Sequence, residues 1–405
     1  MELKAISGGV CAAAGYKAAG ICCGIRKKDK KDLALIVSEK KAAAACVYTT
    51  NLVKGAPIAV TKAHVADGWA QAVVCNSGNA NTCNDNGIEI AEGMCALAEK
   101  ATGIPASDVI VASPGVIGQK LSLAPIEAGM PGLAAALSET GSDEAAQAIM
   151  TTDTKKKEVA FAFTLGGKTC RIGGIAKGSG MIHPNMATML VFVTTDAAIA
   201  PALLQKALRA DVQESFNMIS VDGDTSTNDM VAVLANGMAG NAPVETEGED
   251  YDAFCAALAA VTKTLCRAIA ADGEGATKLL ECRVTGAADL TAARTVAKSV
   301  VCSSLFKAAM FGADANWGRV LCAIGYSGAE VDVDAVSVSF RSAAGAVTVC
   351  EKGRGVPFSE EEAKQVLSEK EILVEIGLGD GAAAATAWGC DLTYDYVKIN
   401  GDYRT

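Results

Sequence analysis

The stretch "KGSGMIHPNMATMLVFV" runs from Lys177 to Val193 and joins a glycine-rich loop to an apolar run, with the hydroxyl of Thr188 at the junction. The run from Met189 to Val193 has the length and the apolar character of a strand buried on both faces. Threonine suits the start of such a strand because β-branched side chains favour strands. The simplest interpretation of Thr188 is therefore structural, and only the rest of the chain can change it.

Composition narrows the possible functions. The chain has 405 residues, 50% of them hydrophobic, and a net charge of −10. These values are typical of a globular protein of one or two domains that lacks a cationic surface for nucleic acid or anionic lipid. No apolar run approaches the roughly eighteen uncharged residues of a membrane span. We therefore expect no nucleic acid and no membrane among its partners.

The numbers and positions of cysteines and histidines indicate the cellular compartment and the kinds of catalytic site that the chain can form. Fifteen cysteines are scattered from Cys11 to Cys390 without a CxxC pair, and the amino-terminal segment lacks the pattern of a secretory signal. We therefore expect a cytosolic protein with reduced thiols. Because His64 and His183 are the only histidines, we expect neither a metal site nor a serine–histidine–aspartate triad.

Strand-like runs alternate with helical patterns along the chain, which predicts a mixed α/β protein. The predicted strands are 33–37, 72–75, 109–112 and 191–194, and the predicted helices are 88–101, 201–216, 251–271 and 303–311. The segment "GGKT" resembles the end of a phosphate-binding P-loop, but Ala162 stands where that loop needs its first glycine. We interpret Gly166 and Gly167 as a hairpin turn instead.

Thr188 also has a chemical interpretation. A hydroxyl is a weak nucleophile at neutral pH and needs a base, which two histidines can hardly supply. An α-amino group, with an unperturbed pKa of about 7.7–8.0, can act as that base for its own residue. This amine exists only if the chain is cut between Ala187 and Thr188, where the small Ala187 leaves its carbonyl accessible. The cut would give an alpha chain of residues 1–187 and a beta chain of residues 188–405.

Five separated motifs change the balance between these two interpretations. They are "TTDT" at 151–154, "KGSGMIHPNMATML" at 177–190, "DGEGATK" at 272–278, "GADANWGR" at 312–319 and "YDYVKINGDYRT" at 394–405. With these motifs in this order, the chain resembles the ornithine acetyltransferase family over essentially its whole length. The resemblance implies a mixed α/β (α+β) fold, a layered helix–sheet–sheet–helix sandwich.

The resemblance also implies a reaction and the residues that perform it. The threonine that matches Thr188 is the self-cleavage point and the nucleophile, which takes acetyl from N-acetylornithine and gives it to glutamate in arginine biosynthesis. The positions that hold the substrate match Thr151, Lys177, Thr188, Glu274, Asn400 and Thr405. This agrees with the chemistry of a zwitterionic amino acid, which needs a cation such as Lys177 for its carboxylate and an anion such as Glu274 for its ammonium.

The same resemblance implies the partners. They are N-acetylornithine, glutamate, and the protein's own alpha and beta chains, assembled as an alpha2beta2 heterotetramer. No metal and no cofactor is implied. Acetyl-coenzyme A is a candidate second donor, although no coenzyme A motif stands out in the sequence.

One departure from the family pattern concerns the oxyanion hole. The family shows a threonine hydroxyl and a glycine N–H in "STGVIG", where this chain has "SPGVIG" from Ser113 to Gly118. Pro114 has neither a hydroxyl nor an N–H to donate, so Gly115 is the remaining donor of that pair. Losing one such donor commonly costs roughly 10²–10³ in rate. We expect that Ser113 or a water substitutes, or that turnover is slower.

Two other functions stay open from the sequence. The chain could be a hydrolase with an amino-terminal threonine, an amidase or aminopeptidase, if water rather than an amino acid takes the acyl group. It could also be a binding protein that has lost catalysis, which Pro114 alone favours. His183 is interpreted as a loop side chain rather than a catalytic one.

Overall fold

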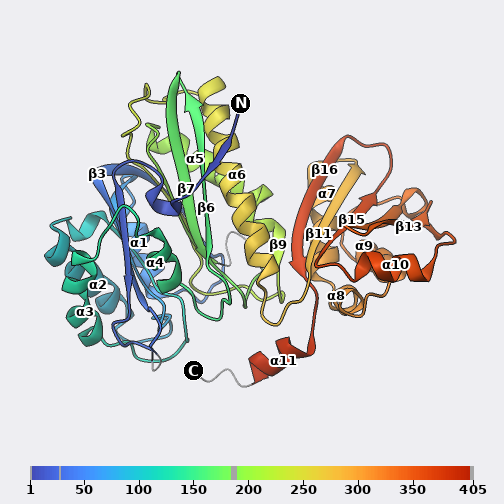
Figure 1. Ribbon diagram of the computed structural model, residues 1–405, viewed down its shortest axis with the longest axis horizontal. Helices are drawn as coiled ribbons and strands as arrows, with labels where there is room; N and C mark the ends of the chain where they lie inside the picture. The colour runs from blue at the N-terminus through green and yellow to red at the C-terminus, as the bar shows by residue number, and fades with distance from the viewer. Residues whose placement is uncertain (1, 27–28, 184–188, 402–405) are drawn as a thin grey trace. The chain divides into compact units, whose positions relative to one another are not determined.

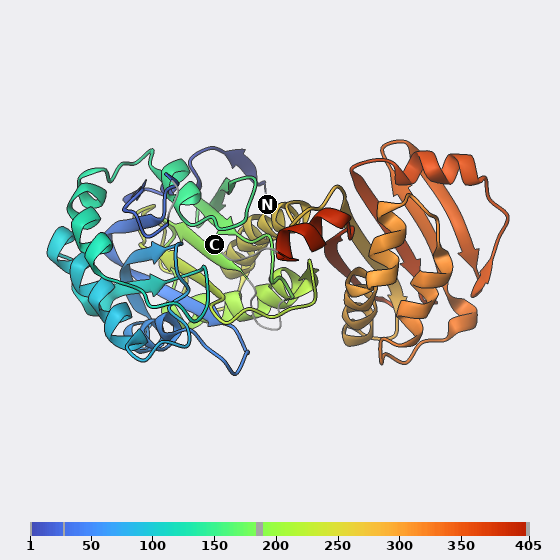
Figure 2. The same cartoon turned by 90° about the horizontal axis from the view of Figure 1, so that it is seen from below.

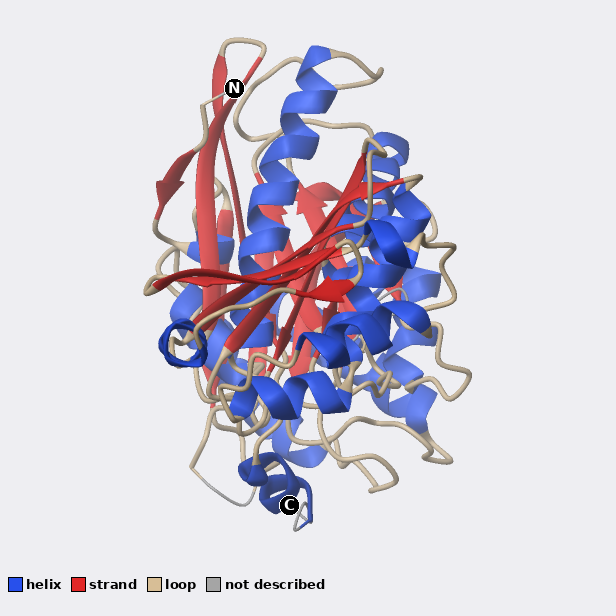
Figure 3. Cartoon of the chain, turned by 90° about the vertical axis from the view of Figure 1, so that its right-hand side faces the viewer, coloured by secondary structure: helices blue, strands red, loops and turns tan. Residues whose placement is uncertain are grey.

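The computed structural model describes residues 2–26, 29–183 and 189–401. The chain divides into two compact units. The first unit comprises Met1–Gly178, Pro184–Phe216 and Thr225–Leu265. The second comprises Ser179–His183, Asn217–Asp224 and Cys266–Thr405. Each unit combines helices with one sheet (Figures 1 and 3), so the predicted mixed α/β class is confirmed.

The first unit is built on a mixed sheet of nine described strands. Their order is β1-β6-β7-β8-β10-β3-β4-β5, with β2 paired to β3. The bounds are β1 Lys4–Ile6, β2 Tyr16–Ile21, β3 Leu33–Tyr48, β4 Trp69–Asn76, β5 Val109–Ala112, β6 Lys157–Leu165, β7 Lys168–Lys177, β8 Leu190–Thr195 and β10 Met230–Ala235. All four predicted strands are confirmed, and β3 extends beyond its predicted end because its second half pairs with β10.

This sheet is covered on both faces. The helices of the first unit are α1 Ala56–His64, α2 Gly87–Thr102, α3 Ala124–Ala135, α4 Ser142–Ala148, α5 Pro201–Glu214 and α6 Glu249–Ala271, the last of which continues into the second unit. Alternate residues of β3 enter two cores: Leu33 and Leu35 pack with residues of α2 and α3, and Ala34 and Ile36 with residues of α4. Figures 1 and 2 show α2 and α3 together on one flank of the sheet. Strands β8 and β10 are consequently buried along their whole length, as strands covered on both faces should be.

The local predictions in this unit are confirmed. Gly166 and Gly167, at φ 51° and 76°, form the two-residue turn between β6 and β7, whose register closes at Leu165 and Lys168. The predicted helices 88–101, 201–216 and 251–271 correspond to α2, α5 and α6. By length and composition α6 could cross a membrane, but half of its apolar window is buried inside the protein. Core helices pass the same test, so this indication is weak.

The second unit has a sheet of seven described strands, in the order β14-β13-β12-β15-β11-β16-β9. The bounds are β9 Ile219–Ser220, β11 Leu279–Ala287, β12 Ser337–Ser342, β13 Gly345–Glu351, β14 Arg354–Gly355, β15 Glu371–Gly377 and β16 Ala383–Cys390. Along β11, Cys282 and Val284 are buried whereas Arg283 is exposed, so one face of the sheet packs against a core. The helices are α7 Leu290–Cys302, α8 Ser304–Phe311, α9 Trp317–Gly325, α10 Glu360–Leu367 and α11 Tyr394–Gly401. Helix α8 confirms the predicted helix 303–311.

Candidate active site

In the first unit, four neighbouring strands have one of their ends at the same edge of the sheet, and the terminal residues pair with one another. Lys177, the last residue of β7, pairs with Leu190, the first residue of β8. Leu190 pairs with Met230 at the start of β10, and Met230 pairs with Tyr48 at the end of β3. The predicted substrate cation Lys177 is therefore placed beside the strand that begins two residues after the predicted nucleophile.

Asp153 links two predicted substrate residues in this unit. Its Oδ2 accepts the backbone N–H of Thr151 at 3.0 Å, and its Oδ1 accepts the N–H of Gly178, which follows Lys177, at 2.7 Å. Lys157 donates to the same Oδ1 at 2.6 Å, and both side chains are out of solvent. Thr151 and Lys177 are thus held relative to each other by one buried carboxylate.

The charge state of Asp153 follows from its surroundings. Burial raises its pKa, but the ammonium groups of Lys177 and Lys157 and the N–H of Gly178 outweigh this and hold the pKa at about 2. Asp153 is therefore ionised at neutral pH. It therefore offsets one of the two lysine charges near this end of β7.

The predicted oxyanion residue Gly115 lies in the loop after β5, with a φ of 136° that side chains other than hydrogen rarely tolerate. A Cβ at this position would also approach the backbone N of Asn79 to 2.8 Å. Among the described residues, the Gly115 N–H has no hydrogen-bond acceptor. It can therefore donate to a bound oxygen, as the prediction requires.

Buried amides hold the loop that carries Pro114. Asn76 donates to Ser113 Oγ at 2.7 Å, and Asn228 donates to the Ser113 carbonyl at 2.7 Å. The Oδ1 of Asn76 also accepts the N–H of Asn79 at 3.1 Å. Ser113 is 1% exposed, so its hydroxyl is fixed next to Pro114 and still has its own hydrogen to donate.

In the second unit, the predicted residues Glu274 and Asn400 lie together. The side-chain amide of Asn400, on α11, donates to Glu274 Oε2 at 2.8 Å. The Glu274 backbone N–H donates to the Ser179 carbonyl at 3.0 Å, and its carboxylate lies against Gly180, where any Cβ would overlap it. The carboxylate is therefore oriented by α11 on one side and by a glycine on the other.

Three residues of the predicted site lie outside the described residues. They are Ala187 and Thr188 at the predicted cleavage point and Thr405 at the end of the chain. The roles predicted for them are taken up below as proposals.

His183 belongs to the second unit and is partly buried. Its Nδ1 lies 3.2 Å from Ser220 Oγ and 3.4 Å from Cys302 Sγ. Burial and the nearby Lys298 ammonium lower its pKa to about 4. The imidazole is therefore neutral at physiological pH. In the part of the chain that the structure describes, no three metal-ligating side chains gather into a cluster.

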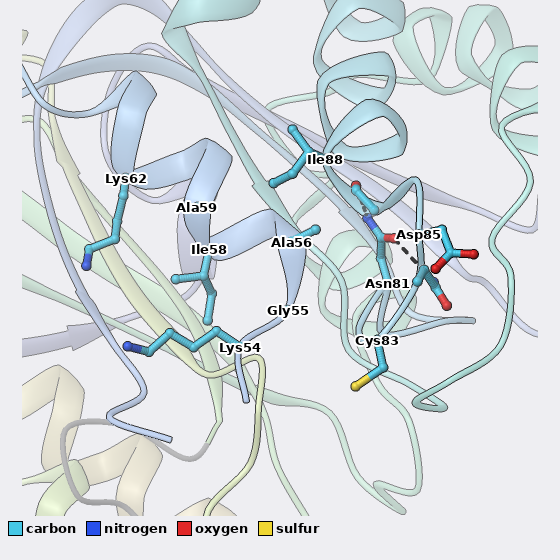
Figure 4. A pocket seen from close by; sticks show the side chains of 12 residues that line it. Lys54, Gly55, Ala56, Ile58, Ala59, Lys62, Asn81, Cys83, Asp85 and Ile88 are labelled. Atoms are coloured by element: carbon cyan, nitrogen blue, oxygen red, sulfur yellow. Dashed lines mark hydrogen bonds between the residues drawn. The ribbon is translucent and has the colours of Figure 1, made fainter. Parts of the chain in front are cut away.

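A separate cavity of about 520 Å³ opens between one side of α1 and the loop that leads into α2. Figure 4 shows Lys54 and Lys62 on the α1 side, and Cys83 and Asp85 on the loop that leads to α2. Asn81 between them donates to the Gly87 carbonyl at 2.8 Å. None of the residues predicted to bind substrate lines this cavity, so we do not assign it to the reaction.

Sequence reasoning missed the residues that hold the predicted site in place. Asp153 lay inside the quoted "TTDT" motif but had no role assigned, and Asn76 and Asn228 were not singled out. A signal for Asn228 existed. The polar run "TSTND" at 225–229 precedes the apolar run 230–235, just as the glycine-rich loop and Thr188 precede β8.

Comparisons with known proteins identify the family and the relatives of this chain. The model of the ArgJ family matches residues 17–405. "Arginine biosynthesis bifunctional protein ArgJ" from Symbiobacterium thermophilum is 55% identical over 403 residues, 99% of each chain. The protein of that name from Caldanaerobacter subterraneus subsp. tengcongensis is 52% identical and covers 96% of this chain and 97% of its own.

A solved structure is also similar. The crystal structure of arginine biosynthesis bifunctional protein argJ from Bacillus halodurans is 49% identical, with a TM-score of 0.50, and covers 52% of this chain and 98% of that chain. The family match extends over nearly the whole sequence, from the second strand to the last residue. This chain belongs to the ArgJ family.

Proposed function

We propose that this chain is an acyltransferase of arginine biosynthesis that moves the acetyl group of N-acetylornithine to glutamate through an acetyl ester on Thr188. The products are ornithine and N-acetylglutamate. The names of relatives at 52–55% identity place those proteins in arginine biosynthesis. The observation that carries the proposal is the pairing of Lys177 with Leu190. It supports Lys177, beside the strand that Thr188 precedes, as the cation for the substrate carboxylate.

Activation by self-cleavage between Ala187 and Thr188 is part of the proposal. Thr188 Oγ attacks the Ala187 carbonyl, the acyl group shifts from nitrogen to oxygen, and water hydrolyses the ester, which frees the α-amino group as a base. The Bacillus halodurans chain matches over 98% of its own length, yet it covers only 52% of this chain. A matching chain of about half the length supports a cut near the middle.

The sheet of the first unit explains how two cleaved chains would stay together. Strands β8 and β10 belong to the beta chain, and they lie between β7 and β3 of the alpha chain. Separating the chains would break both strand pairings and expose two strands that are entirely buried. A cleaved protein therefore remains one folded body, which is the building block of the proposed alpha2beta2 heterotetramer.

The charges of the side chains support the following proposed roles. Lys177 and Thr151 bind the carboxylate end of the amino acid, Glu274 and Asn400 bind its side-chain ammonium together with Thr405, and the Gly115 N–H donates to the developing oxyanion. After acetyl transfer to Thr188, ornithine leaves and glutamate takes its place. The amine that accepted the hydroxyl proton returns it to the leaving amino group.

Two finer points are proposals as well. The relatives are named bifunctional, which supports acetyl-coenzyme A as a second acetyl donor used without any bound cofactor. All fifteen cysteines are free thiols, which supports a reducing, cytosolic location. The hydrolase alternative has less support, since the full-length relatives carry the ArgJ name.

One assay tests the proposal. Purified protein is incubated with N-acetylornithine and glutamate, and separately with acetyl-coenzyme A and glutamate, and N-acetylglutamate is measured. The proposal expects product in the first reaction and, for a bifunctional enzyme, in both. Release of free acetate without N-acetylglutamate would identify a hydrolase instead.

A further inference from the structure

Asn228 is a buried amide that bonds through both ends of its side chain. A carboxamide has two N–H donors and an oxygen with two acceptor positions. The nitrogen of Asn228 donates to the carbonyls of Ala80 at 2.5 Å and Ser113 at 2.7 Å. The oxygen accepts the hydroxyls of Thr82 at 2.6 Å and Thr227 at 2.5 Å. Because a carbonyl can only accept, these partners determine which end of the amide is the nitrogen.

The two carbonyls that Asn228 binds are connected to the two flanks of the predicted oxyanion donor, Gly115. Ser113 lies two residues before Gly115 in the same loop. Ala80 is joined to the residue after it, because the N–H of Ala80 donates to the Val116 carbonyl at 3.0 Å. One side-chain amide therefore ties the chain on both sides of Gly115 to a common point.

The chain between these anchors has little rotational freedom. A hydrogen bond to the Ser113 carbonyl orients the planar peptide group between Ser113 and Pro114. The ring of Pro114 then holds the next rotation, φ, near −65°. On the other side, Gly115 lies against the backbone of Gly78 and Asn79, where a Cβ would approach to 3.0 Å or less. The direction of the Gly115 N–H is consequently determined by how the Ser113 carbonyl is held.

Asn228 is itself held in place. It lies two residues before β10, a strand whose residues are all buried, and its backbone N–H donates to Ser226 Oγ at 3.3 Å. Its side chain lies against Gly55, where any Cβ would overlap the carboxamide. The N–H of Gly55 donates to the Thr227 carbonyl at 3.0 Å. The amide therefore has little room to turn away from the carbonyls that it binds.

We propose that Asn228 is a positioning residue for the Gly115 N–H, an inference that rests on the proposed function. Through the carbonyls of Ser113 and Ala80 it sets the direction of this N–H before substrate binds. A donor oriented in advance stabilises the developing oxyanion without reorganisation at the moment of reaction. This orientation matters more in the present chain because Pro114 offers no second donor beside Gly115.

The test compares Asn228→Ala with the matched control Asn236→Ala. Asn236 follows the other end of β10, is buried like Asn228, and donates to the Ala14 carbonyl at 2.9 Å and to Ser38 Oγ at 3.1 Å. Each variant removes a buried amide whose nitrogen makes two hydrogen bonds, so both should lower Tm. N228A should also lower kcat for acetyl transfer by about 10²-fold. Its KM for N-acetylornithine should change less than about threefold, and N236A should keep both constants within about twofold of the wild type.

A substrate with a weaker hydrogen-bond acceptor separates positioning from a merely structural role. In N-thioacetylornithine a sulfur replaces the acetyl oxygen, and sulfur accepts hydrogen bonds more weakly than oxygen. The ratio of kcat/KM for the oxygen substrate to kcat/KM for the sulfur substrate therefore reports the contribution of the oxyanion hydrogen bond. This ratio should fall about tenfold in N228A and stay at the wild-type value in N236A. General destabilisation would lower both constants by the same factor and leave the ratio unchanged.

If N228A does not fold, Thr82→Val makes a milder change, because it removes one hydroxyl that orients the Asn228 amide and leaves the amide in place. Its kcat and its substrate ratio should fall in the same direction by smaller factors, while Thr82→Ser should stay close to the wild type. An unchanged kcat in N228A, equal losses of kcat in N228A and N236A, or an unmoved ratio in the folded variant would overturn the inference. Wild-type protein without acetyl transfer would instead overturn the proposed function.

Discussion

Lys157 Nζ lies 2.6 Å from Asp153 Oδ1, and both side chains are out of solvent. The same carboxylate accepts the N–H groups of Thr151 and Gly178. One buried ion pair therefore fixes the turn that carries Thr151 and the end of the strand that carries Lys177. A change at Asp153 should affect both stability and substrate binding.

Asp153→Asn should lower the free energy of unfolding by about 3–5 kcal/mol at pH 7, because it removes the carboxylate that pairs with the buried Lys157 ammonium. It should also raise KM for N-acetylornithine more than it changes kcat. Urea unfolding and steady-state kinetics measure the two effects. A variant that keeps wild-type stability would contradict this account of the ion pair.

The pH dependence of stability offers a second check on Asp153. Its pKa of about 2 in the folded protein lies below the value of about 3.9 in an unfolded chain. The group therefore stabilises the fold above pH 4, and this contribution, about 2 kcal/mol, is lost as pH falls toward 2. When the pH falls from 5 to 2, the free energy of unfolding of the wild type should decrease by about 2 kcal/mol more than that of D153N. Parallel losses in the two proteins would show that the carboxylate is not held in its ionised form.

Pro114→Thr should raise kcat, by up to the roughly 10²–10³ of one restored oxyanion donor, with little change in substrate binding. The fixed hydroxyl of Ser113, which Asn76 holds at 2.7 Å, offers a competing outcome. If Ser113 already substitutes, P114T is nearly neutral and Ser113→Ala lowers kcat. If neither variant changes kcat, the oxyanion role given to Gly115 loses its support.

Gly180→Ala should displace the Glu274 carboxylate, because a Cβ at Gly180 would overlap it. The expected result is a KM for N-acetylornithine raised about tenfold or more. Gly132→Ala is the matched control, since a Cβ on this exposed α3 residue meets nothing within 4 Å. It should leave the kinetics unchanged and stabilise the helix by about 0.5–1 kcal/mol. Equal KM values for the two variants would argue against Glu274 as a substrate residue.

Initial-rate kinetics should show the parallel lines of a ping-pong scheme, because Thr188 carries the acetyl group between two amino acids that use one site in turn. Mass spectrometry after brief exposure to N-acetylornithine should find an acetyl group on Thr188. Intersecting lines without a trapped ester would exclude the covalent route.

Local patterns in the sequence predicted local structure well. The apolar run before Thr194 is a buried strand, and the glycine pair at 166–167 is a hairpin turn, because each depends on a few neighbouring residues. The supports of the site depend on contacts between distant segments and were not predictable. Asn228 bonds the Ser113 carbonyl across 115 positions, and Asp153 bonds Gly178 across 25. No periodicity in one sequence indicates that such residues meet.

The most direct test of the central claim is the amino-terminal sequence and intact mass of the purified protein, beside the Thr188→Ala variant. We predict two chains for the wild type, residues 1–187 and 188–405, with Thr188 as the new amino terminus. The variant should be one intact chain without transferase activity. A single intact wild-type chain with full activity, or a new terminus other than Thr188, would contradict the account.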